Sequence, residues 1–132
     1  MSLVLDTHAA VWYLLKPGNL SNTALQRIRH TAGKGQPLYI SAISIIELIY
    51  LVERGRIPRQ SLEKLMNVVK DPASGFLVAD VTVEISQAVE NVSRDVVPEM
   101  PDRIITATAL HLDLPLVTRD AKIQAAGITS IW

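Results

Sequence analysis

The sequence lacks cysteine, and it also lacks an excess of charge of either sign. The missing thiols exclude a disulfide scaffold and a thiolate metal site, and a chain without disulfides fits the reducing cytoplasm. The 13 basic and 13 acidic residues give no net charge, so any binding to nucleic acid must depend on a local patch. We therefore expect a cytoplasmic protein whose function rests on a few localised groups.

Long apolar runs are absent as well. The N-terminal stretch has no basic region and is interrupted by Asp6, which argues against a signal peptide. No run of about 18 apolar residues is present, so we expect no association with a membrane. There is also no internal repeat, low-complexity tract or long linker. We expect residues 1–132 to form one domain, because a chain of this length buries roughly two-thirds of its surface.

Short apolar runs alternate with longer helical patterns along the whole chain. The first run, Leu3-Val4-Leu5, is apolar at every position, as in a strand that is covered on both faces. Such alternation predicts a parallel sheet with helices on both sides. The predicted strands are residues 2–5, 37–41, 76–81, 114–118 and 128–132, and the predicted helices are residues 7–15, 21–32, 44–54, 58–70, 82–94, 102–112 and 120–127.

Four carboxylates occupy similar places in this pattern. Asp6 ends the first strand, and Glu47 falls in the first turn of the helix after the second strand. Asp102 begins the helix before the fourth strand, and Asp120 follows that strand. In an alternating α/β fold these junctions all lie at the carboxyl edge of the sheet, where ligands bind. The pattern therefore predicts that the four acids lie close together.

Each acid also has a purely structural interpretation. Asp6 and Asp120 could cap the helices that follow them. Ser44 and Glu47 match the spacing of a capping box, and Asp102 suits the first turn of a helix. Taken singly, each is more often structural than catalytic. As a set they are harder to explain, because an unpaired carboxylate among the apolar neighbours of Glu47 would be costly.

The local charges favour a metal ion at this edge. No lysine or arginine adjoins Asp6 or Glu47, whereas Arg103 and Arg119 flank the other two acids and are expected to pair with them. Ligands that are all oxygen atoms favour a hard cation, Mg²⁺ or Mn²⁺. Such an ion polarises a phosphoryl oxygen and lowers the pKa of a bound water. The chemistry that this predicts is hydrolysis of a phosphodiester.

Three segments resemble the PIN-domain ribonucleases, and in particular the VapC-type toxins of bacterial toxin–antitoxin pairs. They are LVLDTHAAVW at the N-terminus, SAISIIEL in the middle and DRIITATALHLDLPLVTRD near the C-terminus. The resemblance covers nearly the whole chain. It implies a three-layer α/β/α fold around a central five-stranded parallel sheet with strand order 3-2-1-4-5. That order reverses direction beside Asp6 and Asp120.

The resemblance also implies an activity and partners. It implies a nuclease that uses Mg²⁺ or Mn²⁺ to cleave single-stranded RNA, forms a homodimer, and is silenced by a cognate antitoxin protein. The acids that it implies as catalytic residues and metal ligands are Asp6, Glu47, Asp102 and Asp120, with the hydroxyl of Thr118 orienting a water or a ligand. Weaker candidates for contact with the substrate are Thr7, Arg103 and Arg119.

Two non-catalytic alternatives remain open, and one enzymatic rival is weaker. A receiver-like phospho-acceptor domain needs an acidic pair after the first strand, where this chain has Thr7-His8, and a lysine after the last strand, where it has none. A PIN fold that only binds a partner is disfavoured by the presence of all four acids. A haloacid-dehalogenase-type phosphatase needs an aspartate at the position of His8.

Other polar and aromatic residues are interpreted as structural. We expect His8 to lie at the surface, and Trp12 to pack or form an interface rather than to stack on a base. Four basic residues are expected to form a solvated face at the end of the third predicted helix, in the turn after it and along the fourth predicted helix. They are Arg54, Arg56, Arg59 and Lys64. Residues 53–75 match no motif and are a candidate region for the choice of partner.

Overall fold

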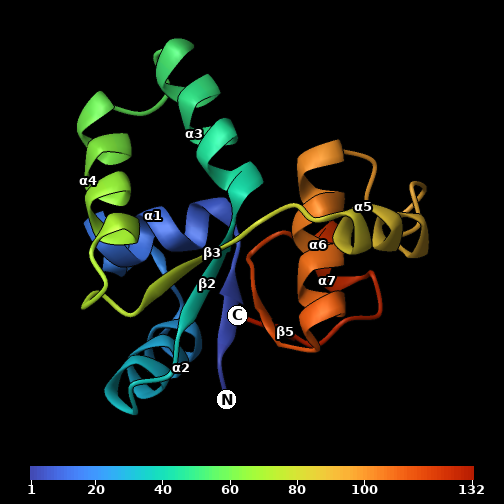
Figure 1. Cartoon of the computed structure of the whole chain (residues 1–132), viewed down its shortest axis with the longest axis horizontal. Coiled ribbons are helices and arrows are strands. Elements are labelled where there is room, and N and C mark those ends of the chain that lie inside the picture. The colour runs from blue at the N-terminus through green and yellow to red at the C-terminus, as the bar shows by residue number, and fades with distance from the viewer.

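The computed structural model describes residues 1–132 as a five-stranded parallel sheet between two layers of helices (Figure 1). The strand order is β3-β2-β1-β4-β5, and every neighbouring pair is parallel. The predicted fold class and strand order are therefore confirmed. The strands are β1 (Leu3–Leu5), β2 (Leu38–Ser41), β3 (Phe76–Ala79), β4 (Leu116–Val117) and β5 (Ser130–Ile131).

Successive strand residues contribute to two separate cores on the two faces of the sheet. Leu3 and Leu5 pack into one apolar cluster, whereas Val4 between them packs into the other. All three side chains are fully buried, which explains why this strand is apolar at every position. Helices α1 (Thr7–Leu15), α2 (Asn22–Gly33), α3 (Ala42–Glu53) and α4 (Arg59–Lys70) contribute to the first cluster. Helices α5 (Val83–Ala88), α6 (Met100–Leu112) and α7 (Ala121–Gln124) contribute to the second, together with Ile43 of α3.

Helix α3 begins two residues earlier than its apolar pattern predicted. Ser41 is both the last residue of β2 and the N-cap of α3, because its hydroxyl accepts a hydrogen bond from the Ile43 N–H at 3.2 Å. The chain therefore passes from strand to helix without a linker. Glu47 lies in the second turn of α3 and not in the first, so the predicted capping box of Ser44 and Glu47 is wrong.

The segment before α6 also differs from the prediction. The helix expected over residues 82–94 consists of α5 and a short 3₁₀ helix, η2 (Val89–Asn91), and α6 starts at Met100. The Arg103 guanidinium donates hydrogen bonds to the carbonyl oxygens of Val89, at 3.0 Å, and Val92, at 2.9 Å. The expectation that Arg103 pairs with Asp102 is therefore wrong: this arginine ties η2 to α6 instead.

The sheet order puts the reversal of the winding at β1. This strand pairs with β2 on one side and β4 on the other, so the chain leaves β1 at the point where the two halves of the sheet diverge. Ligand sites in open parallel sheets lie outside the carboxyl ends of the strands at such a point. A second short 3₁₀ helix, η1 (Pro17–Asn19), follows α1. None of the helices has the length and apolar character needed to cross a membrane.

Candidate active site

The four predicted acids line one cavity at the carboxyl edge of the sheet. The cavity has a volume of about 390 Å³ and collects residues that follow β1 and β4 and residues of three helices far apart in sequence. Seven of its eight lining residues are polar or charged. The lining residues are Asp6, Thr7, His8, Trp12, Glu47, Asp102, Arg119 and Asp120. The predicted convergence of Asp6, Glu47, Asp102 and Asp120 is therefore what the structure shows.

Asp6 and Asp120 are held by the helices that they begin. Asp6 Oδ1 accepts a hydrogen bond from the Ala9 N–H at 2.8 Å, and Asp120 Oδ1 accepts one from the Lys122 N–H at 2.8 Å. Each aspartate therefore caps its helix, but only through Oδ1. No backbone N–H donates a hydrogen bond to Oδ2 of either side chain. These caps fix the carboxylates at the carboxyl ends of β1 and β4 while leaving each an oxygen for a ligand.

Thr118 lies beneath these two acids. Its side chain is fully buried at the end of β4, and its hydroxyl accepts a hydrogen bond from the Asp120 N–H at 3.0 Å. Burial raises the pKa of the Asp6 carboxyl, and the Thr118 hydroxyl is the largest of the opposing effects. The Thr118 hydroxyl therefore bonds the backbone of Asp120, acts on the Asp6 carboxyl and is shielded from solvent, which suits the positioning of these residues rather than direct contact with a substrate.

Glu47 is positioned by Thr7 across the gap between α1 and α3. The Thr7 hydroxyl donates a hydrogen bond to Glu47 Oε1 at 2.6 Å, and the same oxygen of Thr7 lies 2.8 Å from the hydroxyl of Ser44. Thr7 is only 4% exposed, and Asp6 is the N-cap of α1. We infer that Thr7 holds Glu47 in place, while the substrate contact expected from the sequence stays a prediction.

We predict that Thr7→Val lowers the activity of the site while Thr7→Ser retains it. Valine has nearly the same shape as threonine but cannot donate to Glu47, so the carboxylate loses its orientation. Loss of a group that orients a metal ligand typically costs about 10- to 100-fold in metal affinity or activity. Titration of Mn²⁺ into each variant would measure the change, and equal affinities for Val and Ser would contradict it.

The raised pKa of Asp102 reflects the negative electrostatic potential of the cavity. The pKa of its carboxyl is raised to about 6, first by burial and then by the negative charges of its neighbours. In decreasing order of effect, these neighbours are Glu47, Asp120, Asp6 and Glu99. Perturbed carboxyl groups facing one another in a cavity are characteristic of functional sites, because folding alone gains nothing from bringing like charges together.

No cationic side chain forms an ion pair with this cluster. The single ion pair of the structure joins Arg59 and Glu63 on the exposed face of α4, so the predicted pairing of Arg119 with Asp120 is absent. Arg119 is exposed and lines the cavity. Its guanidinium remains available for an anionic ligand.

The chemistry of the donors fits a hard divalent cation. Four carboxylates supply only oxygen atoms, and no cationic side chain is paired with any of them. As they lie in this structure, no three acidic or histidine side chains are close enough together to hold one ion. The cavity therefore has the right ligands and the room for an ion, while the side chains are spaced more widely than bound ligands would be.

Comparison with known proteins identifies the family. The profile of the PIN domain family matches residues 3–128 of this chain. The chain belongs to the PIN-domain family. A curated relative, the ribonuclease VapC22 of Mycobacterium tuberculosis, is 28% identical over 124 residues, covering 94% of this chain and 91% of that protein. The resemblance on which the predicted fold and site were based is thus confirmed.

Solved structures of toxin–antitoxin complexes share the fold of this PIN domain. A VapBC2 complex of Rickettsia felis, bound to a fragment of promoter DNA, matches with a TM-score of 0.73 at 19% identity, covering 98% of this chain and 97% of that chain. A DNA-bound VapBC complex of Salmonella typhimurium matches with a TM-score of 0.71 at 18% identity, covering 98% and 96%. The receiver-like alternative is excluded, because receiver domains have the strand order 2-1-3-4-5.

Two further residues, His8 and Trp12, line the PIN-domain cavity. His8 is exposed and Trp12 packs against the first apolar cluster, as the sequence predicted, but their place in the cavity was not predicted. The signal that could have identified them is spacing: positions 8 and 12 lie one helical turn apart, on the side of α1 that starts at Asp6. Glu99, which also acts on Asp102, lies before α6 and carried no signal in the sequence.

Proposed function

We propose that this PIN-domain protein is a metal-dependent endoribonuclease that cleaves phosphodiester bonds of single-stranded RNA. The observation that carries the proposal is the set of four unpaired carboxylates around one cavity, at the carboxyl edge of a sheet with the family's strand order. The similarity to a protein named as a ribonuclease supports RNA as the substrate. Like charges are brought together here at a cost that a bound cation would offset.

Mg²⁺ or Mn²⁺ is the proposed cofactor, held by Asp6, Glu47, Asp102 and Asp120. When bound, such an ion polarises the scissile phosphate and lowers the pKa of a water, which supplies the nucleophile. The protein's own residues then have distinct tasks. The caps on Asp6 and Asp120 fix two carboxylates, and Thr118 supports the backbone of Asp120 and the carboxyl of Asp6. Thr7 fixes Glu47.

Arg119 is the proposed phosphate contact of the cavity. It is the one cationic side chain among the lining residues and has no carboxylate partner. A guanidinium matches the geometry of phosphate oxygens. Arg103 does not share this role, because its guanidinium donates hydrogen bonds to the backbone carbonyls of Val89, in η2, and of Val92.

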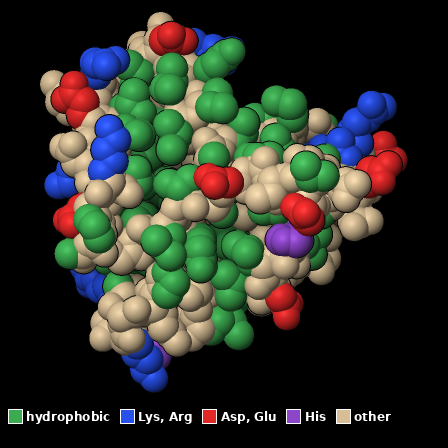
Figure 2. Space-filling model, viewed as in Figure 1, with side chains coloured by type: hydrophobic (Ala, Val, Ile, Leu, Met, Phe, Trp, Pro, Cys, Tyr) green, Lys and Arg blue, Asp and Glu red, His purple; other side chains and the backbone are tan.

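The proposed biological context is a toxin–antitoxin pair with a cognate antitoxin as partner. Several solved relatives of the same fold are toxin–antitoxin complexes, including one from Klebsiella pneumoniae. A homodimer is proposed from an apolar surface between α3 and α6. It includes Ile46, Tyr50 and Met100, which are 49%, 55% and 64% exposed, around a cavity of about 420 Å³. Figure 2 shows hydrophobic side chains gathered along the side of the α3–α4 arm that faces this hollow.

The decisive experiment is an RNA cleavage assay with the purified protein. We expect internal cleavage of unstructured or structured RNA, transfer RNA included, in the presence of Mg²⁺ or Mn²⁺ and none in EDTA. Calorimetric titration with Mn²⁺ in parallel separates the alternatives. Metal binding without cleavage of any RNA would support a PIN fold that only binds a partner, and the absence of metal binding would contradict the proposed chemistry altogether.

A further inference from the structure

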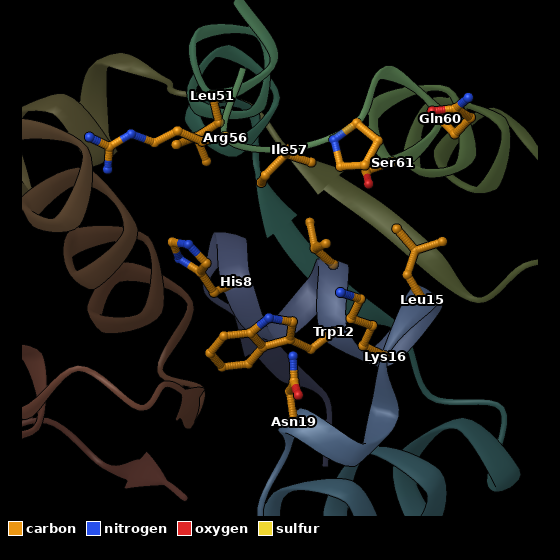
Figure 3. A pocket seen from close by; sticks show the side chains of 12 residues that line it. His8, Trp12, Leu15, Lys16, Asn19, Leu51, Arg56, Ile57, Gln60 and Ser61 are labelled. Carbon is orange, nitrogen blue, oxygen red and sulfur yellow. The ribbon is translucent and has the colours of Figure 1, made fainter. Parts of the chain in front are cut away.

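A second, larger cavity adjoins the acidic one. It has a volume of about 670 Å³ and shares His8 and Trp12 with its neighbour, so the two cavities meet at these side chains. One wall is α1 and the turn that follows it; the other wall is the connection from α3 to α4. Figure 3 shows the Trp12 indole between these walls, with Lys16 and Asn19 beside it and Ile57 opposite.

The far wall is shaped by a tight turn at the end of α3. Gly55 has a φ of +70°, a conformation that glycine adopts without strain. Its N–H donates to the Val52 carbonyl at 3.0 Å, and the Arg56 N–H donates to the Leu51 carbonyl at 2.9 Å. These two bonds form a Schellman motif that ends α3 and reverses the chain. Arg56 and Ile57 are thereby placed at the mouth of the cavity.

The two cavities differ in charge. The larger one is lined by two cations, Lys16 and Arg56, and by no carboxylate. Both cations are exposed, and neither belongs to an ion pair. The other basic residues near this turn are occupied, since Arg54 lies over the Tyr50 ring at 6.0 Å and Arg59 pairs with Glu63. The cavity lined by the four proposed metal ligands, which is negatively charged, therefore adjoins a larger cavity that is lined by two cations.

Trp12 supplies an aromatic surface at the junction. Its ring centroid lies 5.5 Å from His8 at an interplanar angle of 49°, and 6.0 Å from Trp132 at 57°. These tilted contacts support the half-buried indole, which still lines both cavities. A supported aromatic ring between a phosphate-cleaving site and two unpaired cations has the parts that single-stranded nucleic acid requires: a stacking surface and contacts for the backbone.

We propose that the larger cavity is a nucleotide subsite, in which Trp12 stacks on a base next to the scissile phosphate and Lys16 and Arg56 hold the adjoining phosphates. This proposal rests on the proposed ribonuclease function and specifies how its substrate is held. The cavity favours a strand of RNA over an acidic peptide because its flat aromatic surface is continuous with the acidic cavity. The amide side chains of Asn19 and Gln60 line the same cavity and can contact the edge of a base.

The test uses Trp12 as a reporter in EDTA, where no cleavage occurs. Trp132→Phe leaves Trp12 as the sole tryptophan of the chain. At low ionic strength, pentauridylate should quench its fluorescence, and a pentameric sugar-phosphate chain without bases should bind at least about fivefold more weakly. Trp12→Leu should lower the affinity for labelled pentauridylate about 5- to 150-fold, the range measured for loss of one stacked base.

Exposed variants provide a second measurement that does not depend on the packing of Trp12. Lys16→Gln and Arg56→Gln should each raise the KM for RNA cleavage with little change in kcat, and should each reduce the salt dependence of binding by about 0.7 in a log–log plot. Arg29→Gln, which removes an exposed cation from α2 outside both cavities, is the matched control and should change neither.

The outcomes separate this proposal from the function on which it rests. If the protein cleaves RNA, but pentauridylate does not change the fluorescence of Trp12 and KM is unchanged in Lys16→Gln and Arg56→Gln, the subsite is overturned. The proposed nuclease activity would then still stand. Quenching by pentauridylate without cleavage of any RNA would support the subsite and contradict the nuclease. A protein partner that alters Trp12 fluorescence when RNA does not would show a docking site for protein and overturn the proposal.

Discussion

Replacing Asp6 by asparagine should reduce metal-dependent RNA cleavage by at least about 100-fold. Asparagine keeps the size of the side chain but removes the negative charge that would attract the cation, and loss of one electrostatic contact in an active site typically has an effect of this size. The comparison is a single-turnover cleavage rate at saturating Mn²⁺ for the wild-type protein and the variant. A variant that retains most of its activity would show that Asp6 is a helix cap and no more.

The same substitution distinguishes function from stability. Asp6 caps α1 through Oδ1, and the asparagine carbonyl can accept the same bond from the Ala9 N–H. Burial raises the pKa of the Asp6 carboxyl, so a neutral side chain at this position relieves an unfavourable charge. Without metal, Asp6→Asn should therefore unfold at the same temperature as the wild type or higher.

Asp6→Ala is the matched control for the cap. Alanine removes the charge and also the acceptor, and loss of an N-cap typically lowers the free energy of unfolding by about 1 kcal/mol. Asp6→Ala should therefore be inactive and less stable than Asp6→Asn. If both variants were equally destabilised without metal, the carboxylate itself would be a structural group and the proposed metal site would lose its central ligand.

The sheet could be predicted from the sequence because its signals are local. Leu3, Val4 and Leu5 are apolar in succession, which fits only a strand covered on both faces, and each strand is followed by a helical pattern. The strand order came from the family resemblance and is confirmed. The strands are shorter than predicted, because several apolar residues at their ends pack in loops that carry no ladder hydrogen bonds. Leu114 is one of these residues.

The errors concern contacts between distant segments. Ser41 and Ser44 are equally good helix caps by residue type, and only the end of β2 decides that Ser41 is used. Arg103 follows Asp102 directly, yet its guanidinium reaches carbonyls of η2 because the chain before α6 folds back beside it. Neither choice is encoded in the adjacent residues, so local patterns could not predict them.

The candidate site was predictable in part for the same reason. The four acids lie at strand and helix ends, and the alternation of the fold alone places those ends at one edge. The larger cavity depends on the α3–α4 connection folding against α1, and no short motif marks that approach. Trp12 and Arg56 therefore line the same cavity only because of how the chain folds, since they are far apart in the sequence.

The metal-free protein should lose stability as the pH rises from about 4 to about 7. Asp102 has a pKa raised to about 6, so the folded state binds its proton more tightly than the unfolded chain does. In this interval the folded protein holds more protons, and the free energy of unfolding must fall with increasing pH. Asp102 is half-buried and screened by solvent, so we expect its contribution to be about 1 kcal/mol.

Thermal unfolding in EDTA across this range checks the sign, with Asp102→Asn as the control. The variant has no proton to lose at this position, so its stability should decline less than that of the wild type. Equal slopes for the two proteins would show that Asp102 titrates as it does in the unfolded chain. A slope of the opposite sign, specific to the wild type, would indicate a carboxylate stabilised by a partner that the structure does not show.

Divalent cations should reverse this loss. At a concentration 100 times its dissociation constant, a ligand that binds only the folded state adds about 2.7 kcal/mol to the free energy of unfolding. Mg²⁺ or Mn²⁺ should therefore raise the unfolding temperature at pH 7.5, and much less at pH 4.5, where protons compete for Asp6 and Asp102. Potassium chloride of equal ionic strength separates screening from binding. A stabilisation of the same size in Asp102→Asn and in the wild type would contradict a role for Asp102 as a ligand, because this variant keeps only three of the four proposed carboxylates.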